Sequence, residues 1–155
     1  MQGKKKIVFV CAGNTCRSPM AEKLFADLLL RRGSGVDYEV SSAGLAASDG
    51  DSAMSCASEA VAEMGLSLTS HRSRLCRVQE LREAALVVTM TESQRQALAP
   101  YLDADKLVCL GSFGGGDIGD PYGNNIAVYR KCLDRIAAAL DNLYDFLQKG
   151  DAGRE

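Results

Sequence analysis

The sequence predicts a single-domain α/β fold, a three-layer sandwich with a central four-stranded parallel sheet and helices on both faces. The length of 155 residues is that of one domain. Apolar residues make up 46% of the chain and charged residues 25%, a balance typical of a globular protein with a sizeable core. Strand-like apolar runs alternate with segments of helical spacing, and this alternation favours right-handed crossovers between parallel strands.

The first half of the chain supplies two of the expected strands and two helices. Strands are expected at residues 6–11 and 38–42, and helices at 19–32 and 53–64. The first strand is rich in β-branched and aromatic residues, which is typical of a strand buried on both faces. Pro19 suits the first position of a helix, and Gly65 suits the position that follows one.

The second half repeats the alternation. Strands are expected at residues 86–90 and 106–110, a short helix from Thr91 to about Pro100, and a long final helix after a Gly-rich loop at 111–125. Thr91 and Gln94 have the spacing of a capping box, which predicts where the short helix begins. We expect the domain to span residues 1–150 and a polar tail to occupy 151–155, with fraying from Gln148 onward.

Charge and composition exclude several classes of function. The 18 basic and 20 acidic residues give a net charge of −2, which argues against nucleic-acid binding by bulk electrostatics. No apolar run approaches the roughly 20 residues of a membrane-spanning helix, so we expect neither nucleic acid nor a membrane as a partner. The six cysteines include no C-x-x-C pair, and the chain has one histidine. We therefore expect no Cys/His metal site. Because the cysteines mostly lie inside apolar patterns and the chain is too long to need disulfides, we expect a reducing, cytoplasmic environment.

The segment from Cys11 to Pro19 joins the first strand to the first helix and is the candidate site. In parallel sheets, ligands bind at the carboxyl ends of the strands, where Cys11 lies. Inward-pointing backbone N–H groups and the helix dipole can form an anion cradle there. Arg17 adds a planar fork that matches two oxygens of a phosphate. The same field favours the thiolate of Cys11 as a nucleophile, and Ser18 can donate a hydrogen bond to it.

Residues 10–22, with the sequence VCAGNTCRSPMAE, resemble the signature of the low-molecular-weight protein tyrosine phosphatase family. The resemblance covers nearly the whole chain. It continues at Ser42–Gly44, His71, Ser73–Arg74 and Asp120–Gly123. It implies a phosphatase domain with the α/β architecture expected above, acting without a cofactor.

The resemblance also implies a role for each residue of the site. Cys11 attacks phosphorus to form a cysteinyl-phosphate, and Asp120 protonates the leaving group and then activates water. A carboxylate on a Gly-rich loop can approach the cradle in this way as a general acid. The phosphate oxygens are held by Arg17 and by the loop residues Ala12, Gly13, Asn14, Thr15, Cys16 and Ser18. The side chains expected to support Asn14 by hydrogen bonds are Ser18, Ser42 and His71.

Thr15 bears on the choice of substrate. Tyrosine-specific members usually carry Ile or Leu at this place, which packs against a phenyl ring, whereas Thr resembles the bacterial protein-arginine phosphatase branch. A phosphoarginine side chain is planar, polar and wide beside its P–N bond, and a small hydroxyl side chain tolerates it better. Asp120 can accept a hydrogen bond from the guanidinium, and Tyr122 would form one wall of the entrance. We expect a phosphorylated protein as partner and phosphoarginine as the target, with phosphotyrosine as the alternative.

Cys16 follows Cys11 by five residues in the same loop. A second thiol so close to a thiolate can form a reversible disulfide that prevents over-oxidation, and the resemblance implies such protection. The alternative is that Cys16 is a small buried residue at the helix start.

Two other classes of function share the cradle. A thiol-linked arsenate reductase needs a relay pair of cysteines, and Cys76, Cys109 and Cys132 are not closely spaced. A non-catalytic phosphate-binding or redox-sensing module would not need an acid such as Asp120.

Overall fold

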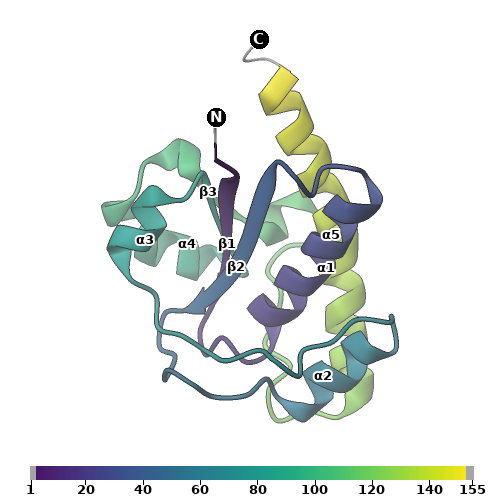
Figure 1. The fold of residues 1–155 in the computed structure, drawn as a ribbon. Helices are drawn as coiled ribbons and strands as arrows, with labels where there is room; N and C mark the ends of the chain where they lie inside the picture. Colours follow the sequence, from purple (N-terminus) through teal and green to yellow (C-terminus); the bar gives the residue numbers. More distant parts are fainter. Residues whose placement is uncertain (1–2, 153–155) are drawn as a thin grey trace.

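The computed structural model describes residues 3–152 and contains a four-stranded sheet in the order β2-β1-β3-β4. The strands are β1 (Lys5–Cys11), β2 (Tyr38–Gly44), β3 (Leu86–Thr89) and β4 (Leu107–Cys109). Each neighbouring pair is parallel, and the sheet predicted from the alternating pattern is confirmed. In Figure 1, β1 and β2 run from top to bottom, so that their carboxyl ends meet at the bottom of the molecule.

Helices cover both faces of the sheet, as expected. One layer contains α1 (Arg17–Arg31), α5 (Ile126–Ala152) and α2 (Ser55–Ala62), and the other contains α3 (Val78–Glu83) and α4 (Glu92–Leu98). Three short 3-10 helices, η1 (Ala99–Tyr101), η2 (Ala104–Lys106) and η3 (Leu110–Phe113), flank β4.

The side chains of β1 divide the core between these two layers. Ile7 and Phe9 pack with the residues of α1 and α5, and the ring of Phe9 meets that of Phe25 edge to face. Val8 and Val10 pack with the opposite layer. Because successive strand residues point to opposite faces, one apolar strand supports both cores, and the loop that follows Cys11 starts from a rigid base.

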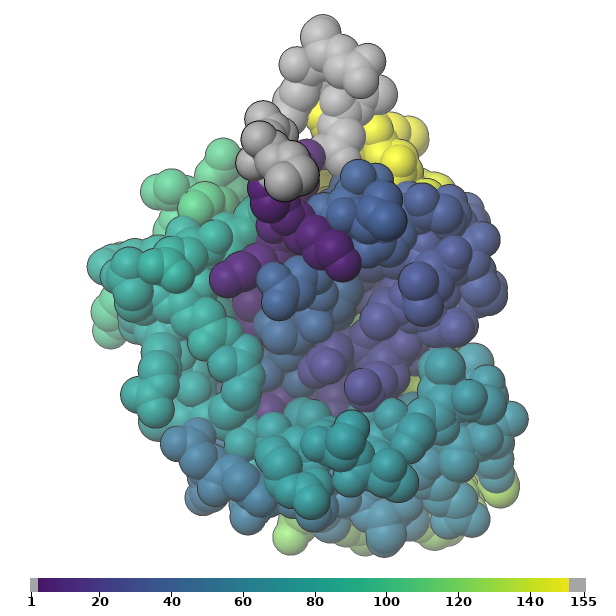
Figure 2. All heavy atoms as spheres, in the orientation of Figure 1, coloured from purple at the N-terminus to yellow at the C-terminus, as the bar shows by residue number. Residues whose placement is uncertain are grey.

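The segment between α2 and α3 crosses the lower end of the molecule. In the space-filling view of Figure 2, this teal segment covers the region beneath β1 and β2 on the side that faces the viewer. Gly44, at the end of β2, pairs with Leu75 of this segment in a parallel bridge. His71 and Arg74 are thereby carried to the carboxyl ends of the strands.

Three expectations about the helices need correction. α1 begins at Arg17, so Pro19 lies within its first turn instead of opening it. α3 was not expected, because its six residues bury only Leu81 and are too short to show a helical period. α5 continues to Ala152, so the expected fraying from Gln148 is wrong for residues 148–152, while 153–155 lie outside the described residues.

None of the helices within residues 3–152 combines the length and the apolar character that a membrane span requires.

Candidate active site

The loop between β1 and α1 turns sharply around the sulfur of Cys11. Among the described residues other than glycine, Asn14 alone has a positive φ, of 57°. Asn adopts this left-handed conformation more readily than most residues do. The turn aims the backbone N–H of Asn14 at the Cys11 sulfur, 3.3 Å away.

The thiol of Cys11 is buried and has a second polar neighbour. The hydroxyl oxygen of Ser18 lies 2.9 Å from the sulfur. The backbone N–H of Asn14 and the hydroxyl of Ser18 can therefore both donate to a thiolate at this position. Hydrogen bonds to the ionised form of a group favour that form, so both contacts support a nucleophilic sulfur.

Asn14 is fully buried and is the centre of the network that shapes the loop. Its side-chain nitrogen donates to the hydroxyls of Ser18 at 2.9 Å and Ser42 at 3.0 Å. Its side-chain oxygen accepts from the backbone N–H of Arg74 at 3.0 Å. Its backbone carbonyl accepts from Nε2 of His71 at 2.7 Å. The contacts that the resemblance implies around Asn14 are all present, and Arg74 is an additional one.

Arg74 extends this network away from the pocket. Its Nε donates to the carbonyl of Ser42 at 3.0 Å, and its guanidinium pairs with both oxygens of Glu80 in α3. Hydrogen bonding to Glu80 raises the pKa of Arg74, and the same contact lowers the pKa of Glu80. The hydroxyl of Ser42 in turn donates to Glu22 at 2.6 Å. Arg74 belongs to the stretch Ser73–Arg74 of the family resemblance, which implies no role for its side chain.

Arg17 is buried, and its guanidinium contacts the loop that carries Asp120. Nη1 donates to the carbonyl of Ile118 at 2.8 Å, and Nη2 lies 3.7 Å from Oδ2 of Asp120. Nε is also buried and has no hydrogen-bond partner among residues 3–152. A buried N–H donor without a partner is costly, and the residue that carries it lines the pocket described below.

Asp120 reaches the pocket from the loop between β4 and α5. Its side chain is half exposed, and Oδ1 accepts from the backbone N–H of Tyr122 at 3.0 Å. Pro121 restricts the backbone of Asp120 to extended conformations. The carboxylate therefore stands at the edge of the pocket, in reach of solvent and of a bound group.

These elements enclose a pocket of about 140 Å³. Its walls are Cys11, Gly13, Thr15, Cys16, Arg17, Asp120 and Tyr122. The nucleophile, the cation and the acid expected from the sequence are thus brought to one cavity, with Thr15 and Tyr122 on its walls. The remaining predicted residues, Ala12, Asn14, Ser18, Ser42 and His71, lie outside this lining. The carbonyl of Ala12 accepts from Ala46 at 2.9 Å, and a Cβ on Gly44 would lie 2.6 Å from the same oxygen.

Cys16 lines the pocket but is largely buried. The hydroxyl of Tyr129 in α5 lies 3.3 Å from its sulfur. Burial raises the pKa of the Cys16 thiol, and it raises the pKa of Tyr129 as well. Tyr129 shares the helical spacing of the buried apolar residues of α5. Nothing in that spacing indicates that its hydroxyl meets a residue of the phosphate loop.

Residues 6–152 match the low molecular weight phosphotyrosine protein phosphatase family. The chain belongs to this family. A protein-arginine-phosphatase of Bacillus subtilis is 39% identical over 149 residues, which cover 92% of this chain and 97% of that one. A low molecular weight protein-tyrosine-phosphatase of Staphylococcus haemolyticus is 33% identical and covers 89% of this chain and 96% of its own.

A solved structure of a family member also superimposes closely. It is a cysteine-to-serine variant of the arginine phosphatase YwlE with a phosphorylated active-site serine. Its sequence is 36% identical to this chain, its TM-score is 0.84, and the match covers 93% of this chain and 96% of that chain.

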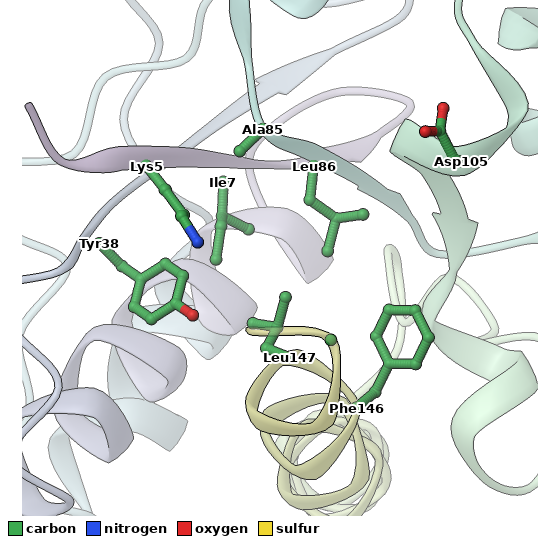
Figure 3. Close-up of a pocket in the computed structure, with 9 residues that line it drawn as sticks. Lys5, Ile7, Tyr38, Ala85, Leu86, Asp105, Phe146 and Leu147 are labelled. Carbon is green, nitrogen blue, oxygen red and sulfur yellow. The ribbon is translucent and has the colours of Figure 1, made fainter. Parts of the chain in front are cut away.

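This phosphatase has another pocket, of about 110 Å³, at the opposite end of the sheet. Figure 3 shows Lys5, Tyr38 and Leu86 around it, at the amino ends of β1, β2 and β3, with Phe146 and Leu147 of α5 facing them. None of the residues expected to bind phosphate lines it. Ligands of open parallel sheets bind at the carboxyl ends of the strands, which places the candidate site at Cys11.

Proposed function

We propose that this protein is a cysteine-dependent protein phosphatase that removes phosphate from phosphoarginine, with phosphotyrosine as the alternative substrate. The convergence of Cys11, Arg17 and Asp120 on one small pocket carries the proposal. A nucleophile, a fixed cation and a carboxylic acid are the three groups that phosphoryl transfer through a covalent intermediate requires.

The first step transfers the phosphoryl group to the enzyme. Loop N–H groups and Arg17 bind the phosphate oxygens, and the Cys11 thiolate attacks phosphorus. An S–P bond forms as the P–N bond of phosphoarginine breaks, and Asp120 gives its proton to the departing nitrogen. With phosphotyrosine the bond that breaks is P–O, and the proton goes to the phenolic oxygen.

The second step releases phosphate. The Asp120 carboxylate takes a proton from water as the water oxygen attacks phosphorus and the S–P bond breaks. The Ser18 hydroxyl, 2.9 Å from the sulfur, donates a hydrogen bond to the thiolate that forms again. The variant YwlE structure with a phosphorylated active-site serine supports a covalent intermediate at the corresponding position of this chain.

Thr15 and the relatives support the choice of phosphoarginine. Thr15 lines the pocket beside Gly13, with no branched alkyl group to pack on a phenyl ring. The tyrosine phosphatase of Staphylococcus haemolyticus is less similar to this chain than the arginine phosphatase of Bacillus subtilis. Tyr122 is exposed at the entrance of the pocket, where the side chain of a phosphoarginine or of a phosphotyrosine would pass it.

The test compares phosphate release from a phosphoarginine peptide and a phosphotyrosine peptide of otherwise identical sequence, in reductant. We expect kcat/KM to be about a hundredfold or more higher for phosphoarginine, because sites built on polar contacts discriminate strongly. Thr15→Ile should lower that ratio, whereas Thr69→Ile, at an exposed position outside the pocket, should not. A reversed ratio in the unmodified protein would favour the alternative, and no release from either peptide would refute phosphatase activity.

The same assay separates the other classes. Asp120→Asn should abolish most turnover, whereas a redox sensor or a phosphate-binding module would keep its function. We also propose a reducing, cytoplasmic environment, which the six free thiols support.

A further inference from the structure

The side chain of Arg135 in α5 is hydrogen-bonded to the loop that precedes Asp120. Its guanidinium donates to three consecutive backbone carbonyls, those of Gly115 at 2.8 Å, Gly116 at 2.9 Å and Asp117 at 2.9 Å. The side chain is half-buried between the helix and the loop. A planar fork of five N–H donors can span several carbonyls in a fixed geometry, whereas the three donors of a lysine all lie on one nitrogen.

The segment bound by Arg135 is rich in glycine, and the backbone N–H of Gly116 also donates to the carbonyl of Gly111 at 3.1 Å. Gly115 and Gly116 both have a φ of 79°, a conformation that side chains rarely adopt, so the segment pays the high entropy cost of ordering glycine. A Cβ on Gly115 would lie 3.1 Å from Nη2 of Arg135, which shows how closely the guanidinium covers this backbone.

Further hydrogen bonds fix Asp117 and Ile118, the part of the loop nearest to the general acid Asp120. Asp117 accepts from the backbone N–H of Glu92 at 2.9 Å, and the N–H of Ile118 donates to Met90 at 3.0 Å. The next contact is the bond from Arg17 to the carbonyl of Ile118. Residues 115–118 are thus held on one side by α5, and on the other by the residues that join β3 to the start of α4 and by the phosphate loop.

Asp120 itself lies beyond the last of these contacts. Behind it is a hollow of about 230 Å³, lined by residues 118–121 and by Val128, Lys131, Cys132 and Arg135. The acid therefore has open space at its back. Its carboxylate contacts Arg17 and the backbone N–H of Tyr122, and the preceding residues direct its backbone.

We propose that Arg135 is a positioning residue for the general acid Asp120. The inference rests on the proposed phosphatase mechanism. By ordering the carbonyls of residues 115–117, Arg135 sets where the loop leaves its anchor at Ile118 and keeps the Asp120 carboxyl beside the leaving atom of the substrate. Its loss would weaken proton donation and leave nucleophilic attack by Cys11 intact.

The test varies the leaving group at constant phosphoryl chemistry. We would measure kcat/KM with para-nitrophenyl phosphate, whose phenolate leaves without help, and with phenyl phosphate, whose phenolate needs a proton. For Arg135→Gln we expect less than about a threefold loss with the first substrate and about a tenfold to hundredfold loss with the second, within the range of general acid catalysis. Asp120→Asn gives the limit of complete loss of the acid.

Two further variants make the result specific. Arg130→Gln is the matched control, since Arg130 also lies on α5 and pairs with Glu63 at an exposed position outside the pocket. It should leave both rates unchanged. Arg135→Lys should recover only part of the phenyl phosphate rate, because a single ammonium nitrogen does not reproduce the planar fork that spans the three carbonyls.

The outcomes distinguish the inference from the function that it rests on. An equal loss of both substrates in Arg135→Gln, or no change in their ratio, would refute the positioning role. If the unmodified protein released phosphate from neither substrate nor from the phosphopeptides, the proposed function itself would fail. A steeper dependence on the leaving group in Arg135→Gln than in Arg130→Gln would support the inference even if the variant were less stable.

Discussion

The guanidinium of Arg17 donates to the carbonyl oxygen of Ile118, 2.8 Å away, although 101 positions separate the two residues in the chain. This bond connects the loop of Cys11, the proposed nucleophile, to the loop of Asp120, the proposed acid, two residues before Asp120. The orientation of Arg17 therefore does not depend on Cys11, and the two groups can be separated by mutation.

Cys11→Ser should abolish turnover and preserve oxyanion binding. A neutral hydroxyl is a far weaker nucleophile than a thiolate, so kcat should fall by at least about a thousandfold. Arg17 and the loop amides remain, so isothermal titration with inorganic phosphate should still give a measurable Kd. Cys56→Ser, at a partly buried cysteine outside the pocket, is the control and should remain active. Full activity in Cys11→Ser would refute the covalent mechanism.

Asn14→Ala should destabilise the protein and weaken phosphate binding together. The substitution leaves the N–H of Arg74 without its acceptor, removes the hydrogen bond that Asn14 donates to the hydroxyl of Ser42, and places Ala at a positive φ. We expect a loss of about 3 kcal/mol in the free energy of unfolding in urea. Asn142→Ala removes a single exposed hydrogen bond to Phe113 and should cost much less. A variant of Asn14 with unchanged phosphate affinity would show that the network does not shape the cradle.

Acidification should weaken the support of the loop through Glu80. Arg74 lowers the pKa of Glu80 below its ordinary value of 4.5, so near that pH the unfolded chain binds more protons than the folded one. The stabilisation is complete above the ordinary value and is lost as the pH falls through the pKa of the folded state. In urea unfolding between neutral pH and about pH 3, Glu80→Gln should show a shallower loss of stability than the unmodified protein. An identical slope for both would contradict this role of the ion pair.

Cys16 should protect Cys11 from irreversible oxidation. Hydrogen peroxide converts the Cys11 thiolate to a sulfenic acid, and attack by the Cys16 sulfur then forms a disulfide and releases water. Activity lost to peroxide should return with dithiothreitol in the unmodified protein. In Cys16→Ser most activity should stay lost, because the sulfenic acid proceeds to sulfinic acid. Equal recovery of both proteins would leave Cys16 with the buried structural role.

Local pattern accounts for the elements and for the centre of the site. The apolar run that ends at Cys11 and the helical spacing in α5 predict the strand and helix that hold the pocket. The spacing of Cys11, Arg17 and Ser18 is local, so one segment of sequence contains most of the cradle. Asp120 was found because the family motif around it is also contiguous.

The residues that sequence reasoning missed act across long separations. Arg135 and Tyr129 fit the helical pattern of α5, and no local signal shows that one meets loop carbonyls and the other meets Cys16. Arg74 binds Asn14 through its backbone N–H, which any residue except proline would supply. Ile118 contributes a carbonyl. Backbone donors and acceptors have no sequence signature, so only the fold reveals these contacts.

Because Arg17 and Ile118 lie 101 positions apart in the chain, the bond between them can form only late in synthesis. The ribosome makes Cys11 early. The residues that fix the loop around it follow at positions 42, 71 and 74. Ile118 and Asp120 are made later still. A nascent chain that ends before Ile118 has a cysteine but no assembled catalytic centre. The proposed phosphatase chemistry therefore requires most of the polypeptide to have been made.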